Sequence, residues 1–361
     1  MTAVKFLLAA DLHLDAKLES NLPPAKARTR RRELLDTFRR ILKLGEEKGA
    51  GVILLAGDLF DADRVSEKTR DYVAATIAEH PGLTVLYLRG NHDGGFGGEE
   101  LPGNVRTFGG TDGWQQYRFG NVVFTGTEDN AAPDIYERLT LAPEDVNIVM
   151  MHGQISPSSS VPAPDTVCLK LLKNRNIDLL ALGHLHTARV EKLDRRGRYA
   201  YPGCPDGRGF DECGEKGVYL FDVGDDGKLT ETFLPTSSRT LHAPEVDVSG
   251  LETYPEVEEK VLDAVSGIPG DDLVKAVLTG SRSPDARPVE EHLTETLRSR
   301  FFFAKVKDMT TLEIRPEDYV GDISLKGEFI RSVLASRMTE EMKNRVILTG
   351  LRALRGEEPD V

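Results

Sequence analysis

The chain has 361 residues, of which 39% are hydrophobic and 29% are charged, and its formal net charge is −13. This length predicts two or three domains, and the composition is that of an ordinary soluble globular protein. The net charge argues against a protein that holds nucleic acid by bulk positive charge, although it leaves room for a local basic surface.

The cysteines and the apolar runs indicate where the protein works. Cys168, Cys204 and Cys213 lack the paired spacing of a structural zinc site, and this usage fits a reducing, intracellular setting. The apolar run at 6–10 is interrupted by Asp11 and is too short for the core of a signal peptide. No stretch is long enough to cross a bilayer. We therefore expect a cytoplasmic protein with no membrane contact.

The first ninety residues predict alternating strands and helices. Buried strands are expected at Val4–Ala10, Val52–Ala56 and Leu83–Leu88. Helices are expected at Ala25–Lys48 and from Ser66, as the N-terminal cap, to about Glu79. This strand–helix alternation predicts a mostly parallel sheet.

From Val105 onward the pattern changes to short strands and tight turns. Hairpins are expected about residues 120–121, 195–197 and 224–227, and further buried strands at Ile148–Met151 and Ile177–Leu182. Parallel strands first and hairpins later predict an α/β fold, in which two central β-sheets are flanked by helices.

The last third of the chain predicts a separate α+β unit and a helical tail. Strands are expected at Leu241–Val248, Leu273–Thr279 and Phe302–Val306, and helices at Tyr254–Val265 and Val289–Arg300. Two further helices, joined near Thr339, follow from Leu325. The expected domains are therefore residues 1–235, a capping domain at 241–318 and a C-terminal helical segment at 325–356.

Five of the predicted strands end in side chains that bind metals. In chain order these are Asp11 and His13, Asp58, Asn91 and His92, His152, and His184 and His186. Each histidine taken alone could be a core or turn residue. Together, carboxylates, imidazoles and an amide without a thiolate suit manganese, iron or zinc. Two such ions can clamp the attacking and leaving oxygens of a displacement at phosphorus.

The same residues carry a family resemblance. The motifs are DLHLD at 11–15, GDLFD at 57–61, GNHD at 90–93, MHG at 151–153 and GHLH at 183–186. They resemble the five motifs of calcineurin-like metallophosphoesterases, and most closely those of SbcD-type DNA double-strand-break repair nucleases, including their YhaO-like branch. The run YPGCP at 201–205, with Phe210 and residues 215–218, is also similar to that group. The resemblance covers about residues 4–223 and extends more loosely over the capping domain.

The resemblance implies a role for each motif residue. Asp11, His13 and His186 would hold the first metal; Asn91, His152 and His184 would hold the second; and Asp58 would bridge both. His92 would face the scissile phosphate and stabilise or protonate the leaving 3′ oxygen. Asp93 would orient His92, or it could serve only as a turn cap.

The implied activity is a two-metal DNA nuclease of double-strand-break repair. It would act as a 3′–5′ exonuclease on duplex ends and as an endonuclease on single strands, with two divalent ions, Mn²⁺ before Fe or Zn. The basic helix face from Lys26 to Lys43 and the loop at 195–198 could neutralise phosphates, or could simply be solvated. Residues 94–98 could be a mobile loop that offers Phe96 for base stacking, or a plain flexible loop.

Partners and competing functions remain open at this point. The resemblance implies that the apolar C-terminal helices dock on an SbcC-type coiled-coil ATPase, and that the nuclease is a homodimer; the alternative is that these helices pack on the chain's own cap. Cys204, where the family often has serine, could be oxidised, coordinate weakly or fill space. The alternative functions are a phosphodiesterase or phosphatase acting on nucleotides or other small phosphoesters, and a silent scaffold that positions an ATPase.

Overall fold

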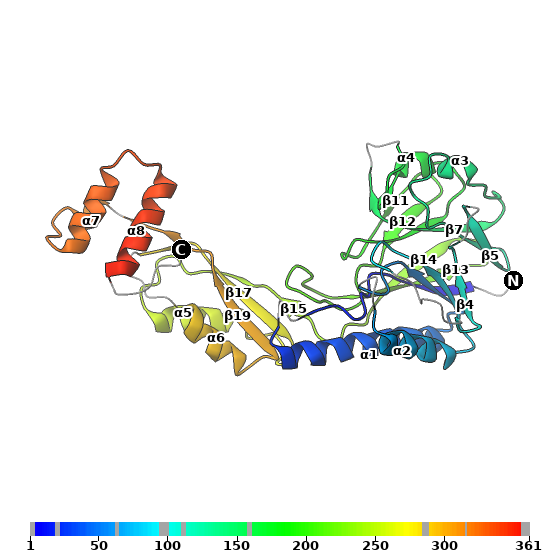
Figure 1. Ribbon diagram of the computed structural model, residues 1–361, viewed down its shortest axis with the longest axis horizontal. Helices are drawn as coiled ribbons and strands as arrows, with labels where there is room; N and C mark the ends of the chain where they lie inside the picture. Colours follow the sequence, from blue (N-terminus) through cyan, green and yellow to red (C-terminus); the bar gives the residue numbers. More distant parts are fainter. Residues whose placement is uncertain are drawn as a thin grey trace. The chain divides into compact units, whose positions relative to one another are not determined.

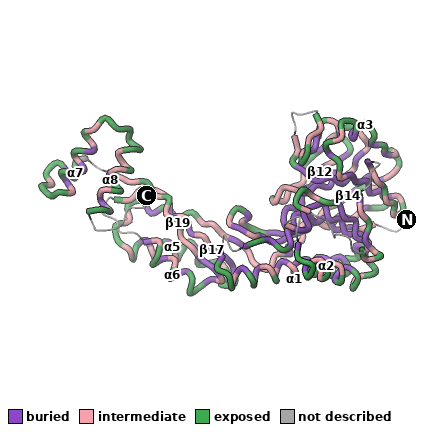
Figure 2. Tube along the Cα trace, in the orientation of Figure 1, coloured by how far each residue is buried: buried purple, intermediate pink, exposed green. Residues whose placement is uncertain are grey.

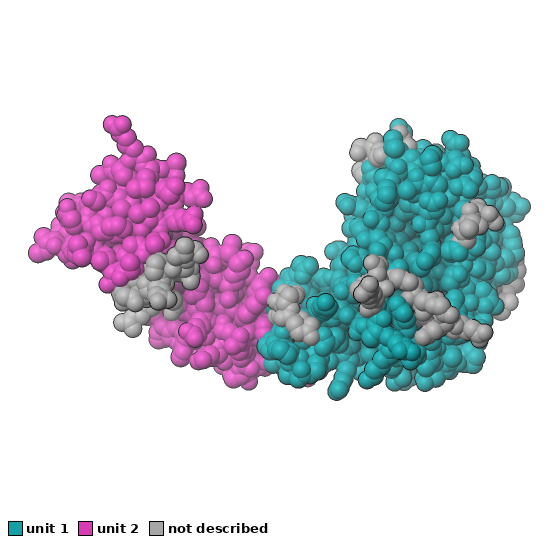
Figure 3. Space-filling view, in the orientation of Figure 1, with its two compact units in different colours: residues 1–240 teal, residues 241–361 magenta. Residues whose placement is uncertain are grey.

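The computed structural model describes residues 4–18, 22–61, 65–93, 101–109, 113–156, 161–283, 289–314 and 316–354. The chain forms two compact units, residues 1–240 and 241–361 (Figure 3). Each unit has its own apolar core. Within the described part of the chain, no helix is long and apolar enough to cross a membrane. The predicted loop at 94–98 lies outside the described residues.

The first unit begins with a mixed sheet in the order β14-β13-β1-β2-β3-β4. Its parallel strands are β1 (Val4–Ala9), β2 (Val52–Ala56), β3 (Thr84–Leu88) and β4 (Val105–Thr107), and its antiparallel strands are β13 (Gly217–Val223) and β14 (Leu229–Pro235). Helices α1 (Pro24–Lys48) and α2 (Glu67–Ala78) lie on the outer side of this sheet (Figure 1). As predicted, the Ser66 hydroxyl caps α2, accepting from the Thr69 N–H at 3.3 Å.

The second sheet of this unit has the order β11-β12-β10-β7-β6-β5. Its members are β5 (Gln115–Phe119), β6 (Val122–Gly126), β7 (Val146–His152), β10 (Leu179–Gly183), β11 (Arg189–Lys192) and β12 (Arg198–Tyr201). The inner four strands run parallel, and each edge strand closes an antiparallel hairpin. Helices α3 (Ile135–Arg138) and α4 (Leu169–Leu172) cover its outer face, and β8 (Gln154–Ile155) pairs with β9 (Thr166–Val167) beside it (Figure 1).

The two sheets face each other across a buried core (Figure 2). On three of the strands the inward-facing side chains become smaller toward the carboxyl end: Phe6, Leu8, Ala10; Val52, Leu54, Ala56; and Leu179, Ala181, Gly183. At the wide end, the ring of Phe6 lies 5.2 Å from those of Phe124 and Phe221. At the narrow end the sheets are in close backbone contact, because a Cβ atom on Gly183 would lie 1.9 Å from the Ala56 carbonyl oxygen.

The second unit contains a four-stranded sheet made of β15 (Leu241–His242), β16 (Glu245–Asp247), β17 (Leu273–Thr279) and β19 (Phe303–Asp308). Helices α5 (Tyr254–Ala264) and α6 (Glu290–Arg298) pack on it through a core of valines and leucines. Strands β18 (Ser281–Arg282) and β20 (Thr311–Leu312) pair in a small second sheet, and a 3₁₀ turn, η1 (Pro316–Tyr319), follows them.

The last two helices are α7 (Leu325–Leu334) and α8 (Glu340–Leu354). They share a small core of Tyr319, Ile330, Val333, Ile347 and Leu351, against which Leu312 and Ile314 of the same unit pack. The chain itself therefore covers part of the apolar surface of the two helices. Apolar side chains that remain exposed on or near them are Val320, Ile323, Leu325, Met338, Met342, Leu348 and Leu354.

The predicted fold class, α/β with two central sheets flanked by helices, is confirmed. One predicted strand, Leu241–Val248, is interrupted, because Pro244 has no N–H to donate to a ladder. The chain resumes in β16 with the same register against β17 that it has in β15.

Part of the predicted basic face of α1 packs against other parts of the first unit and is not solvated. Arg30 is 1% exposed, and its Nη2 lies 2.6 Å from Asp206 Oδ1. Arg40 donates to the Thr236 carbonyl oxygen. In the hairpin at 195–198, Arg196 forms a bidentate pair with Asp178, at 2.9 and 2.7 Å. These three arginine side chains therefore make contacts that stabilise the first unit.

Candidate metal centre

The carboxyl ends of β1, β2, β3, β7 and β10 meet at the narrow end of the core, so side chains from both sheets face one another there. The donor atoms of Asp11, His13 and His186 lie within 4.8 Å of one another. Those of Asp58, His152 and His184 form a second group of the same size. Each group combines residues of the two sheets.

The backbone at this edge adopts conformations that L-residues seldom take. The φ angles are positive at Asp11 (55°), His13 (46°), Asp58 (52°) and His184 (103°). Hydrogen bonds fix the turns, because Asp11 N donates to Gly57 O at 3.0 Å and His13 N to Asp58 O at 2.9 Å. Such conformations cost of order 1–3 kcal/mol each and concentrate at functional sites.

Asp11 is fully buried with one carboxylate oxygen unsatisfied. Its Oδ1 accepts from the His184 N–H at 2.8 Å, whereas Oδ2 has no hydrogen-bond partner. Burial raises the pKa of Asp11 to about 6. A buried carboxylate oxygen without a partner is costly. A cation at this point would satisfy it, so the observed residue fits a metal ligand.

His13 presents one ring nitrogen to the same point. Its Nδ1 lies 2.9 Å from Asp61 Oδ1, and its Nε2 is buried without a hydrogen-bond partner. Burial lowers the pKa of His13, which favours the neutral ring. A neutral imidazole that donates its Nδ1 proton to a carboxylate has its Nε2 lone pair available, which is the usual state of a metal-binding histidine.

In the second group, His152 is held through its Nδ1 atom, as His13 is in the first group. Its Nδ1 lies 2.9 Å from the Ala56 carbonyl oxygen, and its Nε2 lies 3.1 Å from Asn91 Oδ1 and 3.4 Å from Asp58 Oδ2. Burial disfavours the charged forms of His152 and Asp58, but the attraction between these two side chains has the larger effect. It raises the pKa of His152 to about 9 and lowers that of Asp58 to about 2.

Asp58 belongs to the second group and also approaches the first. Its Oδ2 is 3.6 Å from His13 Nε2 in one group and 3.4 Å from His152 Nε2 in the other. Its Oδ1 accepts from the His92 N–H at 3.0 Å. The two histidines that follow β10 each lie beside another predicted ligand. The ring of His184 lies 5.4 Å from that of His152, and the ring of His186 lies 5.2 Å from that of His13.

His92 and Asp93 differ in their surroundings. His92 is exposed, with its ring 5.2 Å from that of His13. The Asp93 carboxylate accepts from the backbone N–H groups of Phe60 at 2.7 Å, Gly90 at 3.0 Å and Leu59 at 3.2 Å. These contacts make Asp93 a turn cap that joins two motifs. Its role in orienting His92 stays a prediction.

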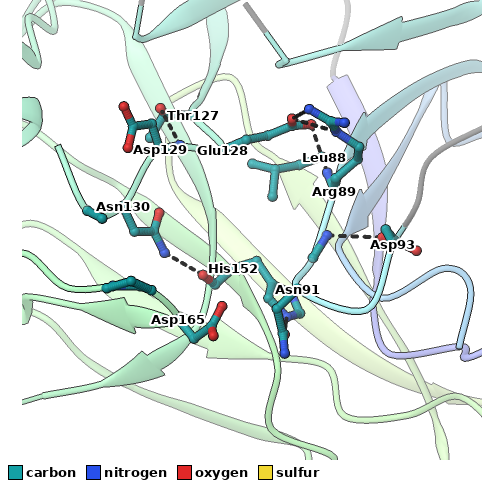
Figure 4. Close-up of a pocket in the computed structure, with 13 residues that line it drawn as sticks. Leu88, Arg89, Asn91, Asp93, Thr127, Glu128, Asp129, Asn130, His152 and Asp165 are labelled. Atoms are coloured by element: carbon teal, nitrogen blue, oxygen red, sulfur yellow. Dashed lines mark hydrogen bonds and ion pairs between the residues drawn. The ribbon is translucent and has the colours of Figure 1, made fainter. Parts of the chain in front are cut away.

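A pocket of about 260 Å³ opens beside Asn91 and His152 (Figure 4). Besides these two residues, its polar lining includes Arg89, Asp93, Thr127, Glu128, Asp129, Asn130 and Asp165. Arg89 is paired with Glu128, with Nε and Oε2 2.7 Å apart. The pocket wall therefore carries more carboxylates than cations.

Several residues of the centre were not predicted as site residues. Asp61 lies within 4.8 Å of both His13 and His92, and Glu212 Oε1 lies 2.7 Å from His186 Nδ1. Arg208 contacts both carboxylates. Asp61 is the last residue of the GDLFD motif, so the motif could have indicated it. Arg208 and Glu212 lie between the residues that carry the second resemblance, which are 201–205, Phe210 and 215–218.

Cys204 packs beside this centre. It is fully buried, its Sγ lies 3.7 Å from the His186 carbonyl oxygen, and burial raises its pKa. A buried protonated thiol with a carbonyl acceptor fills space, which was one of the three alternatives for this residue.

Gly183→Ala is expected to damage this edge, because the new Cβ would meet the Ala56 carbonyl oxygen and force the sheets apart. We expect a loss of about 1–3 kcal/mol in the free energy of unfolding, measured by urea denaturation, together with weaker binding of Mn²⁺. Gly82→Ala is the matched control, since no atom lies within 4 Å of its added Cβ. Equal stability of the two variants would contradict the close contact.

Several known proteins are similar to this chain. The YhaO protein of Bacillus subtilis (strain 168), described as an uncharacterized metallophosphoesterase, is 29% identical over 287 residues, which are 74% of this chain and 68% of that protein. Two solved structures are similar over 64% and 65% of this chain and 99% of theirs: TT1561 of Thermus thermophilus, 16% identical with a TM-score of 0.41, and a dimetal phosphatase from Danio rerio, 12% identical with a TM-score of 0.42.

A family model described as calcineurin-like phosphoesterase matches residues 4–188. This match begins at the first strand, ends two residues after His186 and spans more than half of the chain. All seven predicted metal ligands lie within it. The chain therefore belongs to the calcineurin-like phosphoesterase family.

Proposed function

We propose that this phosphoesterase is a two-metal DNA nuclease that hydrolyses phosphodiester bonds during double-strand-break repair. It would degrade duplex ends in the 3′–5′ direction and cut single strands internally. The observation that carries the proposal is the exposed imidazole of His92, which lies beside two groups of metal-binding side chains, each with two buried members and one half-buried histidine. The motif resemblance to SbcD-type nucleases supports DNA as the substrate.

The residues present fit two divalent cations. One would be held by Asp11, His13 and His186, the other by Asn91, His152 and His184, and both by Asp58. The unsatisfied Asp11 Oδ2 and His13 Nε2 supply donors for the first. A donor set of oxygen and imidazole nitrogen suits Mn²⁺, Fe or Zn. When bound, such ions neutralise phosphate charge and lower the pKa of water.

The side chains of the protein have separate tasks in this proposal. Asp58 holds the backbone N–H of His92 at 3.0 Å and so fixes the turn on which the imidazole stands. His92 would donate a proton from a ring nitrogen to the leaving 3′ oxygen. Asp61 lies within 4.8 Å of a His92 ring nitrogen and can orient the ring.

The positive charge that DNA requires would come from exposed residues of α1. Arg28, Arg32, Arg39 and Lys43 are exposed, in contrast to Arg30. Arg39 also lies over the Tyr72 ring at 5.1 Å, and Lys43 contacts Glu47 at 3.5 Å. Such exposed pairs are weak and can exchange partners with phosphate oxygens.

A second candidate function is hydrolysis of nucleotides or other small phosphoesters. The pocket beside Asn91 and His152 favours it, because Glu128, Asp129 and Asp165 in its wall would repel a polyanionic strand. A small substrate with one phosphate group would meet less of this repulsion. The two candidate functions use the same metal centre and differ only in the substrate, which is DNA in one and a small phosphoester in the other.

The test is degradation of an end-labelled DNA duplex by the purified chain with Mn²⁺, beside a sample treated with EDTA. We expect shortening of the labelled strand that requires the metal and slows at higher salt, because phosphate contacts are screened. A small chromogenic phosphodiester serves as the parallel substrate. Hydrolysis of that diester without any cleavage of DNA would reject the nuclease and favour the second candidate.

We further propose that the nuclease works in the cytoplasm as a homodimer with an SbcC-type coiled-coil ATPase. The three cysteines, all in the described part of the chain, form no disulfide with one another, which suits a reducing compartment. The exposed apolar residues Val320 and Ile323, before α7, and Leu325, its first residue, offer a surface for the ATPase. Co-purification of the two proteins, lost on Ile323→Glu, is the measurement that checks this partner.

A further inference from the structure

We propose that Arg208 and Glu212 are positioning residues that hold the imidazoles of His13 and His186, and so set the affinity of one of the two cation positions. The position concerned is the one made by Asp11, His13 and His186. The inference rests on the metal ligands of the proposed function and is independent of the substrate.

The contacts form one connected unit, which we call the clamp, made of Arg208, Glu212 and Asp61. Glu212 Oε1 lies 2.7 Å from His186 Nδ1 and 2.7 Å from Arg208 Nη2. Glu212 Oε2 accepts from the Arg208 backbone N–H at 2.6 Å. Arg208 Nη1 reaches Asp61 Oδ1 at 3.4 Å, and the same oxygen lies 2.9 Å from His13 Nδ1.

Both imidazoles have a carboxylate at Nδ1, Asp61 for His13 and Glu212 for His186, and the guanidinium of Arg208 joins these carboxylates. They differ in one contact, because Arg208 Nη2 also lies 3.2 Å from His186 Nδ1. A carboxylate at Nδ1 fixes the proton there, orients the ring and leaves Nε2 as the donor to a metal. The Glu212 and Arg208 side chains are only 5% and 15% exposed, so water replaces these contacts poorly.

The other cation position is built without the clamp. His152 Nδ1 faces the Ala56 carbonyl oxygen at 2.9 Å, which belongs to the backbone of β2. Loss of the clamp should therefore weaken one cation position and spare the other. This selectivity separates a positioning role from a general loss of structure.

The segment between β12 and β13 holds the backbone of His186 as well as its ring. Lys216 Nζ donates to the His186 carbonyl oxygen at 3.0 Å, and Cys204 Sγ lies 3.7 Å from the same atom. This segment begins after residue 188, where the match to the family model ends. Residues outside the matched range therefore support a ligand, His186, that lies within it.

The experiment is a calorimetric titration of the EDTA-stripped full chain with Mn²⁺, with bound metal counted by elemental analysis. The wild-type chain should bind two ions. In Glu212→Ala, one ion should bind about 10–100-fold more weakly, and the other should keep its affinity. Glu212→Gln preserves the size of the side chain and one acceptor oxygen, so it should fold normally and lose less affinity.

Glu231→Ala is the matched control. Glu231 lies on β14 and pairs with Arg198 of β12 at 2.5 Å, and it belongs to neither the clamp nor the ligand groups. It should bind both ions as the wild type does. Equal weakening of both ions in Glu212→Gln, or no weakening in either Glu212 variant, would overturn the clamp. Binding of two ions without DNA cleavage would reject only the proposed substrate, whereas no binding by the wild type would overturn the ligand assignment and the clamp together.

Discussion

His92→Ala is expected to lower the rate of phosphodiester hydrolysis by about 10²–10⁴-fold, which is the usual contribution of a general acid. The loss should occur in the catalytic rate and not in the content of bound metal. The His92 side chain is exposed, and its link to Asp58 is made by the backbone N–H, which alanine retains. The measurement is the turnover rate of a chromogenic phosphodiester with Mn²⁺, beside metal analysis of the same preparation.

His80→Ala is the control for this variant. His80 follows α2, and its Nδ1 lies 2.9 Å from Glu46 Oε2, in neither ligand group. Its removal should leave the rate unchanged. Unaltered hydrolysis in His92→Ala would refute the assigned role, and a loss accompanied by loss of metal would reassign His92 as a ligand.

Asp206→Ala is expected to lower the free energy of unfolding by about 3–5 kcal/mol, because it removes one of the two carboxylates paired with the buried guanidinium of Arg30, the other being that of Glu33. Asp206 is 2% exposed and Arg30 is 1% exposed. The same carboxylate also accepts from the Thr37 hydroxyl at 2.8 Å and from the Ser238 N–H at 3.0 Å. Urea denaturation of the full chain, followed by circular dichroism, measures the loss.

Glu47→Ala provides the comparison on the same helix. Glu47 pairs with Lys43 at 3.5 Å, and both side chains are more than half exposed. Removal of such a pair should change the free energy of unfolding by less than about 1 kcal/mol. A similar loss in Glu47→Ala and Asp206→Ala would mean that the burial of the Arg30 pair contributes nothing.

Much of the fold could be predicted because local patterns and tertiary contacts agree. Val52–Ala56 and Leu273–Thr279 are strands with the predicted bounds. Each is a largely apolar run that a glycine, Gly57 or Gly280, ends directly. The predicted metal ligands come together because the parallel strands of each sheet end at one edge, and these edges of the two sheets lie side by side.

The partners of those ligands could not be predicted, because they depend on distances across the fold. Glu212 follows His186 by 26 residues, and no periodicity relates the two. Arg30 is a different case, because it precedes Leu34 by four residues and Phe38 by eight, and so lies on the buried stripe of α1. Because Arg30 stands in a run of arginines, it was assigned to the basic face of the helix, although its spacing to Leu34 and Phe38 is that of a buried position.

The inward-facing side chains of β1, β2 and β10 become smaller toward the metal centre, and the backbones of the two sheets come into close contact there. Farther from the centre, Phe6, Phe124 and Phe221 hold the sheets apart, whereas Ala56 and Gly183 leave room for the close contact. Because each ligand group takes residues from both sheets, the spacing of the sheets sets the distances between ligands. We therefore expect a change of side-chain volume deep in the core to alter metal binding, although the changed residue touches neither metal nor substrate.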